Sequence, residues 1–127
     1  MTDTLALTDT PADDLTMVDA TVVVHLNTSC DSAGRPKGFL DGYQPGDFLE
    51  RALEYRLPVL PTVAGINAAL EQVYFDLNVG DDPAFAPVPK EAVLQYRAAG
   101  NRSLSVGDVV EILDRRYAVA RSGFCPL

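Results

Sequence analysis

The side chains that could do chemistry in this chain begin with its single histidine, His25, which lies close to the cysteine Cys30. A thiol beside an imidazole and a carboxylate such as Asp31 is an arrangement that nucleophilic catalysis uses. These residues, however, fall in one short segment, VVVHLNTSCD, where a strand followed by a loop gives no reason for their side chains to converge. We therefore expect His25 to be a histidine of the core or the sheet, and the protein not to be an enzyme.

Neither a metal nor a cofactor is expected. One histidine rules out a site built from several histidines, and the two cysteines, Cys30 and Cys125, are too few and too far apart for a zinc site. Asp81 and Asp82 are adjacent, but the local sequence supplies too few further oxygen ligands for a cation. In a reducing compartment both cysteines stay free thiols.

The stretch NRSLSVGDVVEI, residues 101–112, places serines, a glycine and an aspartate ahead of a β-branched run. Ser103 and Ser105 lack the first glycine, the following helix and the histidine partner of a nucleophile elbow. Gly107 allows a positive φ, and Asp108 can accept hydrogen bonds from nearby backbone N–H groups. The stretch therefore predicts a turn or bulge that leads the chain into a β-hairpin.

The same region carries a resemblance to known proteins. Its pattern is RSLSVGDVV from Arg102, then Tyr117, then GFCP from Gly123. This pattern resembles the C-terminal signature of a family of small proteins carried by actinobacteria, their phages and their plasmids, and YodL-like domains of mobile elements end similarly. The clear resemblance covers about a fifth of the chain, residues 101–127. It implies no activity, and no role for its motif residues Ser103, Ser105, Gly107, Asp108, Gly123 and Phe124.

The resemblance implies an accessory protein of a phage or mobile element, and we expect it to act by binding a host or phage protein. The alternative is an RNA- or DNA-binding module. Residues 90–127 hold six bases against four acids, a net +2, and the VGDVV run also resembles the strand entry of RNA-associated PUA and ASCH domains. The phosphate contacts of this alternative would come from Arg97, Arg102, Arg115, Arg116 and Arg121. Ordinary solvated charge on a hairpin would explain the same arginines.

Composition indicates a globular protein with an acidic N-terminal segment. The chain has 127 residues and a net charge of −8, with 47% hydrophobic and 22% charged residues. Residues 1–19 contain five acids and no base, whereas residues 20–127 contain 13 acids and 10 bases. We expect residues 1–16 to be flexible and residues 17–127 to form one domain. No apolar run approaches the ~20 residues of a membrane span, and no secretory signal is evident, so we expect a cytoplasmic protein, in the host cell if phage-encoded.

Met17–Asn27 is rich in β-branched residues and predicts a strand. Its continuous apolar run indicates burial on both faces and a central place in the sheet. A loop rich in glycine and proline follows over residues 28–46. Within it, Phe39 and Tyr43 are candidate exposed anchors for a partner protein.

Three helices are predicted next. The first starts near Pro45, with Asp47 as its N-terminal residue, and ends before Pro58, because Phe48, Leu49, Ala52 and Leu53 form an apolar stripe at helical spacing. The second begins after an N-cap at Thr62 and ends at Gly80. Its core face is predicted to contain Ile66, Leu70, Val73 and Leu77. The third covers Val88–Ala99, with Gly100 as the residue that ends it.

The C-terminal region predicts a β-hairpin. Its strands are Val109–Leu113 and Tyr117–Arg121, joined by a tight connection at residues 114–116. Ser122 and Gly123 end the hairpin, and Phe124 is expected at the edge of the core. Together the elements predict an α+β fold: a small antiparallel sheet with two or three helices packed on one face and a C-terminal β-hairpin.

Overall fold

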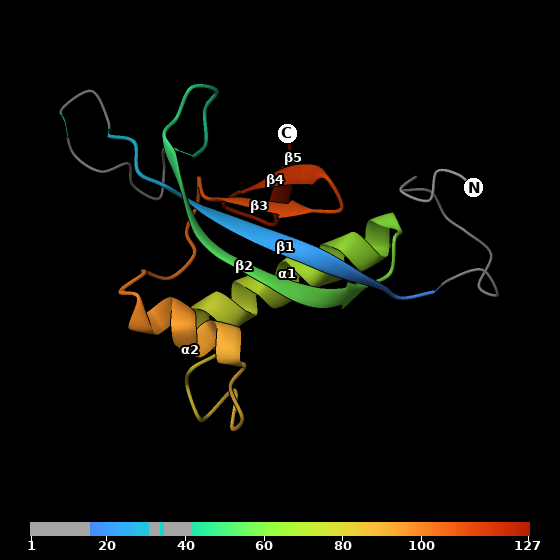
Figure 1. Ribbon diagram of the computed structural model, residues 1–127. Helices are drawn as coiled ribbons and strands as arrows, with labels where there is room; N and C mark the ends of the chain where they lie inside the picture. Colours follow the sequence, from blue (N-terminus) through green and yellow to red (C-terminus); the bar gives the residue numbers. More distant parts are fainter. Residues whose placement is uncertain (1–15, 31–33, 35–41) are drawn as a thin grey trace.

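The computed structural model describes residues 16–30, 34 and 42–127. Within these residues, five antiparallel strands form one sheet in the order β2-β1-β3-β4-β5, and two helices pack on it (Figure 1). The elements are β1 (Val18–Asn27), β2 (Leu49–Val59), α1 (Val63–Val79), α2 (Glu91–Ala98), β3 (Val109–Ile112), β4 (Arg115–Val119) and β5 (Phe124–Pro126). The predicted α+β fold is confirmed.

Strand β1 lies inside the sheet, as predicted, with β2 on one side and β3 on the other. Val22, Val24 and Leu26 are buried and alternate with half-buried neighbours such as Val23 and His25. This period of two means that one face of β1 lies in the core. The expectation of full burial on both faces is therefore met on one face only.

Strand β2 corrects the prediction of a first helix between Asp47 and Pro58. In β2, Tyr55, Leu57 and Val59 are buried and alternate with exposed residues, which is the periodicity of a strand. The helix would have buried Phe48, which is instead 74% exposed. Pro58 lies within β2 and not beyond the end of a helix; an edge strand tolerates proline because its outer N–H groups have no ladder partner.

The two observed helices agree with the sequence prediction, except that α2 begins at Glu91, three residues after the predicted start at Val88. The Thr62 hydroxyl accepts a hydrogen bond from the Gly65 N–H at 3.0 Å and caps α1. The predicted core face of α1 is confirmed, because Ile66, Leu70, Val73 and Leu77 are all buried. Helix α2 is followed by Gly100 with a φ of +84°, as expected for the residue after a helix. Both helices contact β2 and each other.

The C-terminal strands form a hairpin with a tighter turn than predicted. Leu113 and Asp114 have φ values of 53° and 64°, which identify a two-residue turn of the type that fits twisted strands. Arg115 and Arg116, expected in the connection, instead begin β4. Phe124 packs against the core as predicted and also begins β5, a third strand that the sequence did not predict.

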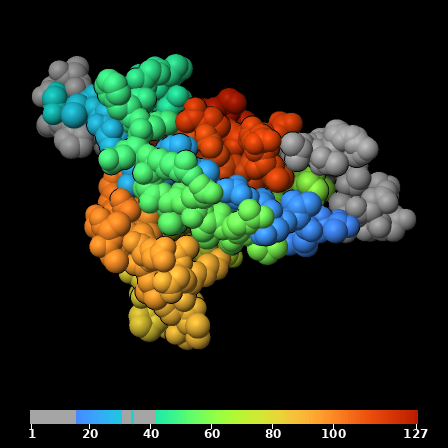
Figure 2. Space-filling model, in the orientation of Figure 1, coloured from blue at the N-terminus to red at the C-terminus, as the bar shows by residue number. Residues whose placement is uncertain are grey.

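The segment between α1 and α2 projects with α2 from one corner of the molecule (Figure 2). It exposes Phe85 and Val88, at 59% and 88%. In the part of the chain that the structure describes, neither helix is long and apolar enough to cross a membrane.

Candidate functional site

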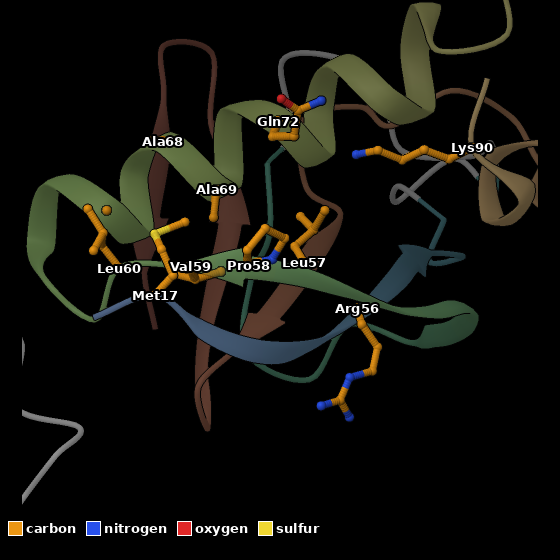
Figure 3. A pocket seen from close by; sticks show the side chains of 11 residues that line it. Met17, Arg56, Leu57, Pro58, Val59, Leu60, Ala68, Ala69, Gln72 and Lys90 are labelled. Carbon is orange, nitrogen blue, oxygen red and sulfur yellow. The ribbon is translucent and has the colours of Figure 1, made fainter. Parts of the chain in front are cut away.

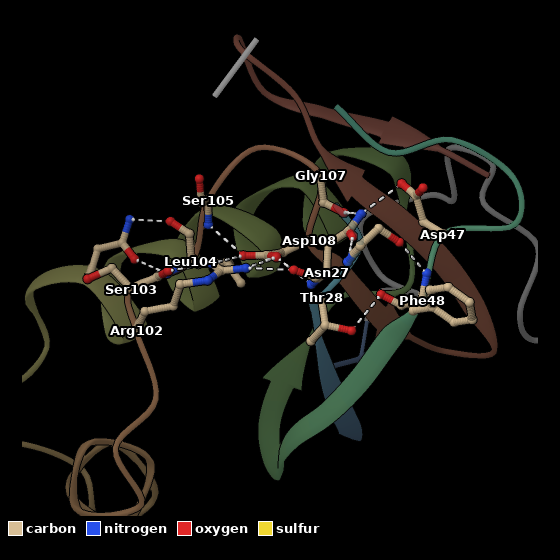
Figure 4. A network of polar contacts seen from close by, with 12 residues as sticks. Asn27, Thr28, Asp47, Phe48, Arg102, Ser103, Leu104, Ser105, Gly107 and Asp108 are labelled. Carbon is tan, nitrogen blue, oxygen red and sulfur yellow. Dashed lines mark hydrogen bonds and ion pairs between the residues drawn. The ribbon is translucent and has the colours of Figure 1, made fainter. Parts of the chain in front are cut away.

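The C-terminal motif is organised around the carboxylate of Asp108, which is completely buried (Figure 4). Its oxygens accept hydrogen bonds from the backbone N–H groups of Asn27, at 2.8 Å, and Ser105, at 2.7 Å. Both terminal nitrogens of Arg102 donate to it at 2.7 Å. The predicted bond between Asp108 and a nearby backbone N–H is therefore present, and a bidentate ion pair adds to it.

Asn27 extends this network across three segments. Its side-chain N–H donates to Asp47 at 2.8 Å and to the Gly107 carbonyl at 3.1 Å. Its side-chain oxygen accepts from the Ser29 N–H at 2.9 Å. We call Asn27, Asp47, Arg102, Ser105 and Asp108 the Asp108 network. Because its members bond to one another, the network joins the end of β1, the segment before β2 and the turn before β3.

The glycines of the motif have structural roles. Gly107 has a φ of +95°, and a Cβ there would lie 3.3 Å from the carbonyl carbon of Gly42. The expected positive φ is confirmed, and the close approach of the segment before β2 adds a second reason for glycine. Gly123 also has a positive φ, +73°, but in open space. Ser103 accepts a hydrogen bond from Arg97 at 3.0 Å.

The arginines of the nucleic-acid alternative have different environments. Arg102 is bound to Asp108, and Arg97 donates to the carbonyls of Leu77, at 2.7 Å, and Asn78, at 3.3 Å, at the C-terminal end of α1. Arg116 lies in β4 with its Nε 3.1 Å from a carboxylate oxygen of Glu111. Arg115 and Arg121 are both exposed. Arg97 and Arg102 are thus built into the fold.

The remaining candidate residues lie apart. Phe39 falls outside the described residues. Tyr43 is half-buried and lines a pocket of about 250 Å³ together with Cys125. His25 lies in β1 with its Nε2 3.4 Å from a carboxylate oxygen of Glu111, so it is a sheet histidine as expected. Among the residues that the structure describes, no group of three or more His, Cys, Asp and Glu could hold a metal ion.

A groove of about 490 Å³ lies between the outer edge of β2 and α1 (Figure 3). Met17 and Leu60 lie at one end, and Gln72 and Lys90 at the other. Small side chains of α1 form one wall: Gly65, Ala68 and Ala69. We call this cavity the β2–α1 groove.

Gly65 is essential to the shape of this groove. A Cβ at this position would lie 2.1 Å from the carbonyl oxygen of Leu60, so only glycine lets α1 approach the connector this closely. The side chain of Ala68 is exposed in the same wall. The groove therefore has room for side chains from another polypeptide segment.

Gln72 and Lys90, which line one end of the groove, both bond to a buried carboxylate, Asp76, which is 3% exposed. Asp76 accepts hydrogen bonds from Lys90 Nζ at 2.8 Å, from the Tyr55 hydroxyl at 2.9 Å and from Gln72 at 2.8 Å. Burial, and then the charge of Asp76, raise the pKa of Tyr55 well above its ordinary value. Lys90 is 42% exposed and has three donors, so an anionic group in the groove can bond to it without displacing Asp76.

Sequence reasoning missed the β2–α1 groove because one of its walls was predicted as a helix. The signal that could have found it is the alternation of Tyr55, Leu57 and Val59 with polar or proline residues. A second signal is the row of small residues beside the core stripe of α1.

Comparison of the chain with models of protein families, with curated proteins and with solved structures found no match. The family resemblance of residues 101–127 therefore depends on the motif itself.

Proposed function

We propose that this protein is a non-enzymatic accessory protein of a phage or mobile element. In this proposal it binds an extended segment of a host or phage protein in the β2–α1 groove. The observation that carries the proposal is an apolar groove beside a strand that ends the sheet.

The sheet edge supports this function. Strand β2 is the terminal strand of the described sheet, so it presents backbone N–H and C=O groups on its outer side. An extended peptide can pair with such groups, while pockets beside the strand accept its side chains. The volume of about 490 Å³ lies within the ~300–1,000 Å³ typical of ligand sites.

The nucleic-acid alternative is less well supported. Phosphate binding needs cations that are available to the ligand. Arg102 is bound to the buried carboxylate of Asp108, and Arg97 binds the carbonyls at the end of α1. Phe39 and Tyr43 stay a predicted second contact for the partner protein.

The test is capture of a partner by the wild-type chain and by a variant with a blocked groove. Ala68→Trp fills the groove from an exposed position of α1, and Ala98→Trp is the matched control on α2, outside the groove. We expect nuclease-treated lysate to yield one stoichiometric protein partner with the wild type and with Ala98→Trp, but not with Ala68→Trp. Thermal denaturation of all three proteins checks folding. Equal capture by Ala68→Trp, or loss of the partner on nuclease treatment, would contradict the proposal.

A further inference from the structure

We propose that the partner segment bound in the β2–α1 groove carries an acidic side chain that bonds to Lys90. In this proposal the acid lies two positions away from an apolar side chain that packs on Ala68 and Ala69. The inference rests on the proposed function, because it names the chemistry of the segment that the same groove binds. Two observations carry it: the charge at one end of the groove, and the spacing of the lining residues along α1.

The groove has one polar end, at Gln72 and Lys90 (Figure 3). The described residues that line it include two bases, Arg56 and Lys90, and no acid. Asp19 already binds Arg56 at the rim, with two hydrogen bonds of 2.8 and 3.0 Å. The Lys90 side chain is 42% exposed, so its ammonium group can meet a ligand that lies in the groove. A carboxylate of the partner therefore finds an opposite charge at this end.

Lys90 is held in position before a partner binds. Asp76 accepts a hydrogen bond from Lys90 Nζ at 2.8 Å, which leaves the other N–H groups of the ammonium for further acceptors. The Tyr55 hydroxyl and Gln72 also donate to Asp76, so this buried carboxylate keeps its own partners when a second carboxylate arrives. A positioned lysine loses less side-chain entropy on binding than a free one. Asp76 offsets part of the lysine's charge, so we expect the acid to strengthen binding by about tenfold and not more.

Helix α1 sets the spacing between the apolar and the acidic side chain of the partner. Ala68 and Gln72 are four residues apart in α1, which corresponds to ~6 Å along the helix axis. Gln72 and Lys90 bond to the same carboxylate, so the ammonium group lies at the level of Gln72. In an extended segment, successive side chains on one face are two residues and ~7 Å apart. A segment that packs one side chain on Ala68 and Ala69 therefore brings the side chain two positions away to Lys90.

The test uses a library of random linear peptides displayed on phage as the probe. Peptides are selected on the wild-type chain after removal of those that bind Ala68→Trp, the variant with the blocked groove. We expect the selected peptides to share an Asp or Glu two positions from an apolar residue. One selected peptide is then synthesised with the acid and with the corresponding amide. In fluorescence anisotropy the wild-type chain should bind the amide peptide about tenfold more weakly than the acidic peptide.

Variants of the chain test whether Lys90 is the group that binds the acid. Lys90→Gln should bind the acidic and the amide peptide equally, and Lys90→Arg should keep the preference for the acidic peptide. Thermal denaturation shows whether Lys90→Gln folds. Gln72→Lys serves as a second variant, because it adds a cation at the same end of the groove and keeps a donor for Asp76. It should tighten binding of the acidic peptide more than Ala98→Lys does, which adds the same charge on α2, outside the groove.

The outcomes separate this inference from the proposed function. Selected peptides without a shared acid would overturn the inference and leave groove binding intact. The same holds for an acid preference that Lys90→Gln retains, or for equal effects of Gln72→Lys and Ala98→Lys. If no selected peptide distinguishes the wild-type chain from Ala68→Trp, the groove does not bind extended segments, and the proposed function fails together with the inference.

Discussion

The Asp108 network makes a strong prediction about stability. Asp108→Asn keeps the volume of the side chain but removes its charge, and its amide N–H₂ group then faces donors that the carboxylate accepted from. Removing one partner of a buried ion pair costs ~3–5 kcal/mol. Because Arg102 is 47% exposed and water can solvate it, we expect the lower end, a loss of about 3 kcal/mol in the free energy of unfolding.

Urea denaturation at neutral pH, followed by circular dichroism, measures this loss. Domains of this size have a free energy of unfolding of ~5–15 kcal/mol, so urea denaturation readily resolves a change of about 3 kcal/mol. Glu50→Gln removes a carboxylate charge from an exposed position of β2 and should change stability by less than ~0.5 kcal/mol. If Asp108→Asn loses less than ~1 kcal/mol, the reasoning that the buried carboxylate holds the three segments together is wrong.

Further predictions concern Tyr55 and three glycines. The raised pKa of Tyr55 means that the unfolded protein loses this proton first, so stability should fall by up to ~1.4 kcal/mol per pH unit above about pH 10. Tyr55→Phe should make stability decrease less steeply with pH when denaturation is measured at alkaline pH. If the variant shows the same slope as the wild type, the assignment of this decrease to Tyr55 is wrong. Gly107→Ala should cost about 2 kcal/mol in urea denaturation, and Gly123→Ala, with a similar φ in open space, should cost less. Gly65→Ala should destabilise the fold by ~1–3 kcal/mol, because α1 must move away from Leu60. It should also reduce partner capture. Unchanged stability would mean that the segment between β2 and α1 adjusts freely.

Elements with strong local signals could be predicted from the sequence. Ile66, Leu70, Val73 and Leu77 repeat at helical spacing over about three turns, and Thr62 supplies the cap, so no distant contact was needed to identify α1. β1 was equally clear because its β-branched run has no helical periodicity.

β2 could not be identified as a strand from its local sequence. Phe48, Leu49, Ala52 and Leu53 satisfy helical spacing, and Pro58 would end a helix as readily as it sits in an edge strand. What decides the structure is the long ladder with β1, a tertiary contact that overrides local preference.

The candidate site could not be predicted from the sequence for the same reason. The aspartate of the motif was predicted to accept from a nearby N–H, and Ser105 provides that bond. Its second backbone donor, Asn27, lies 81 positions away in the chain and could not be inferred from the motif. The β2–α1 groove likewise needs both β2 and α1 in place before it exists.

Pro58 has a consequence for self-assembly. An open strand edge is a template on which further copies of the same strand can add, and this is how edge-to-edge aggregation begins. Proline lacks an N–H, so a second β2 that added along this edge would meet a missing donor at Pro58 and would present the same gap to the next copy. Any extended segment that pairs with this edge meets the same missing donor, so a ladder on it is interrupted at Pro58, and the proline limits how long a continuous sheet the edge can extend.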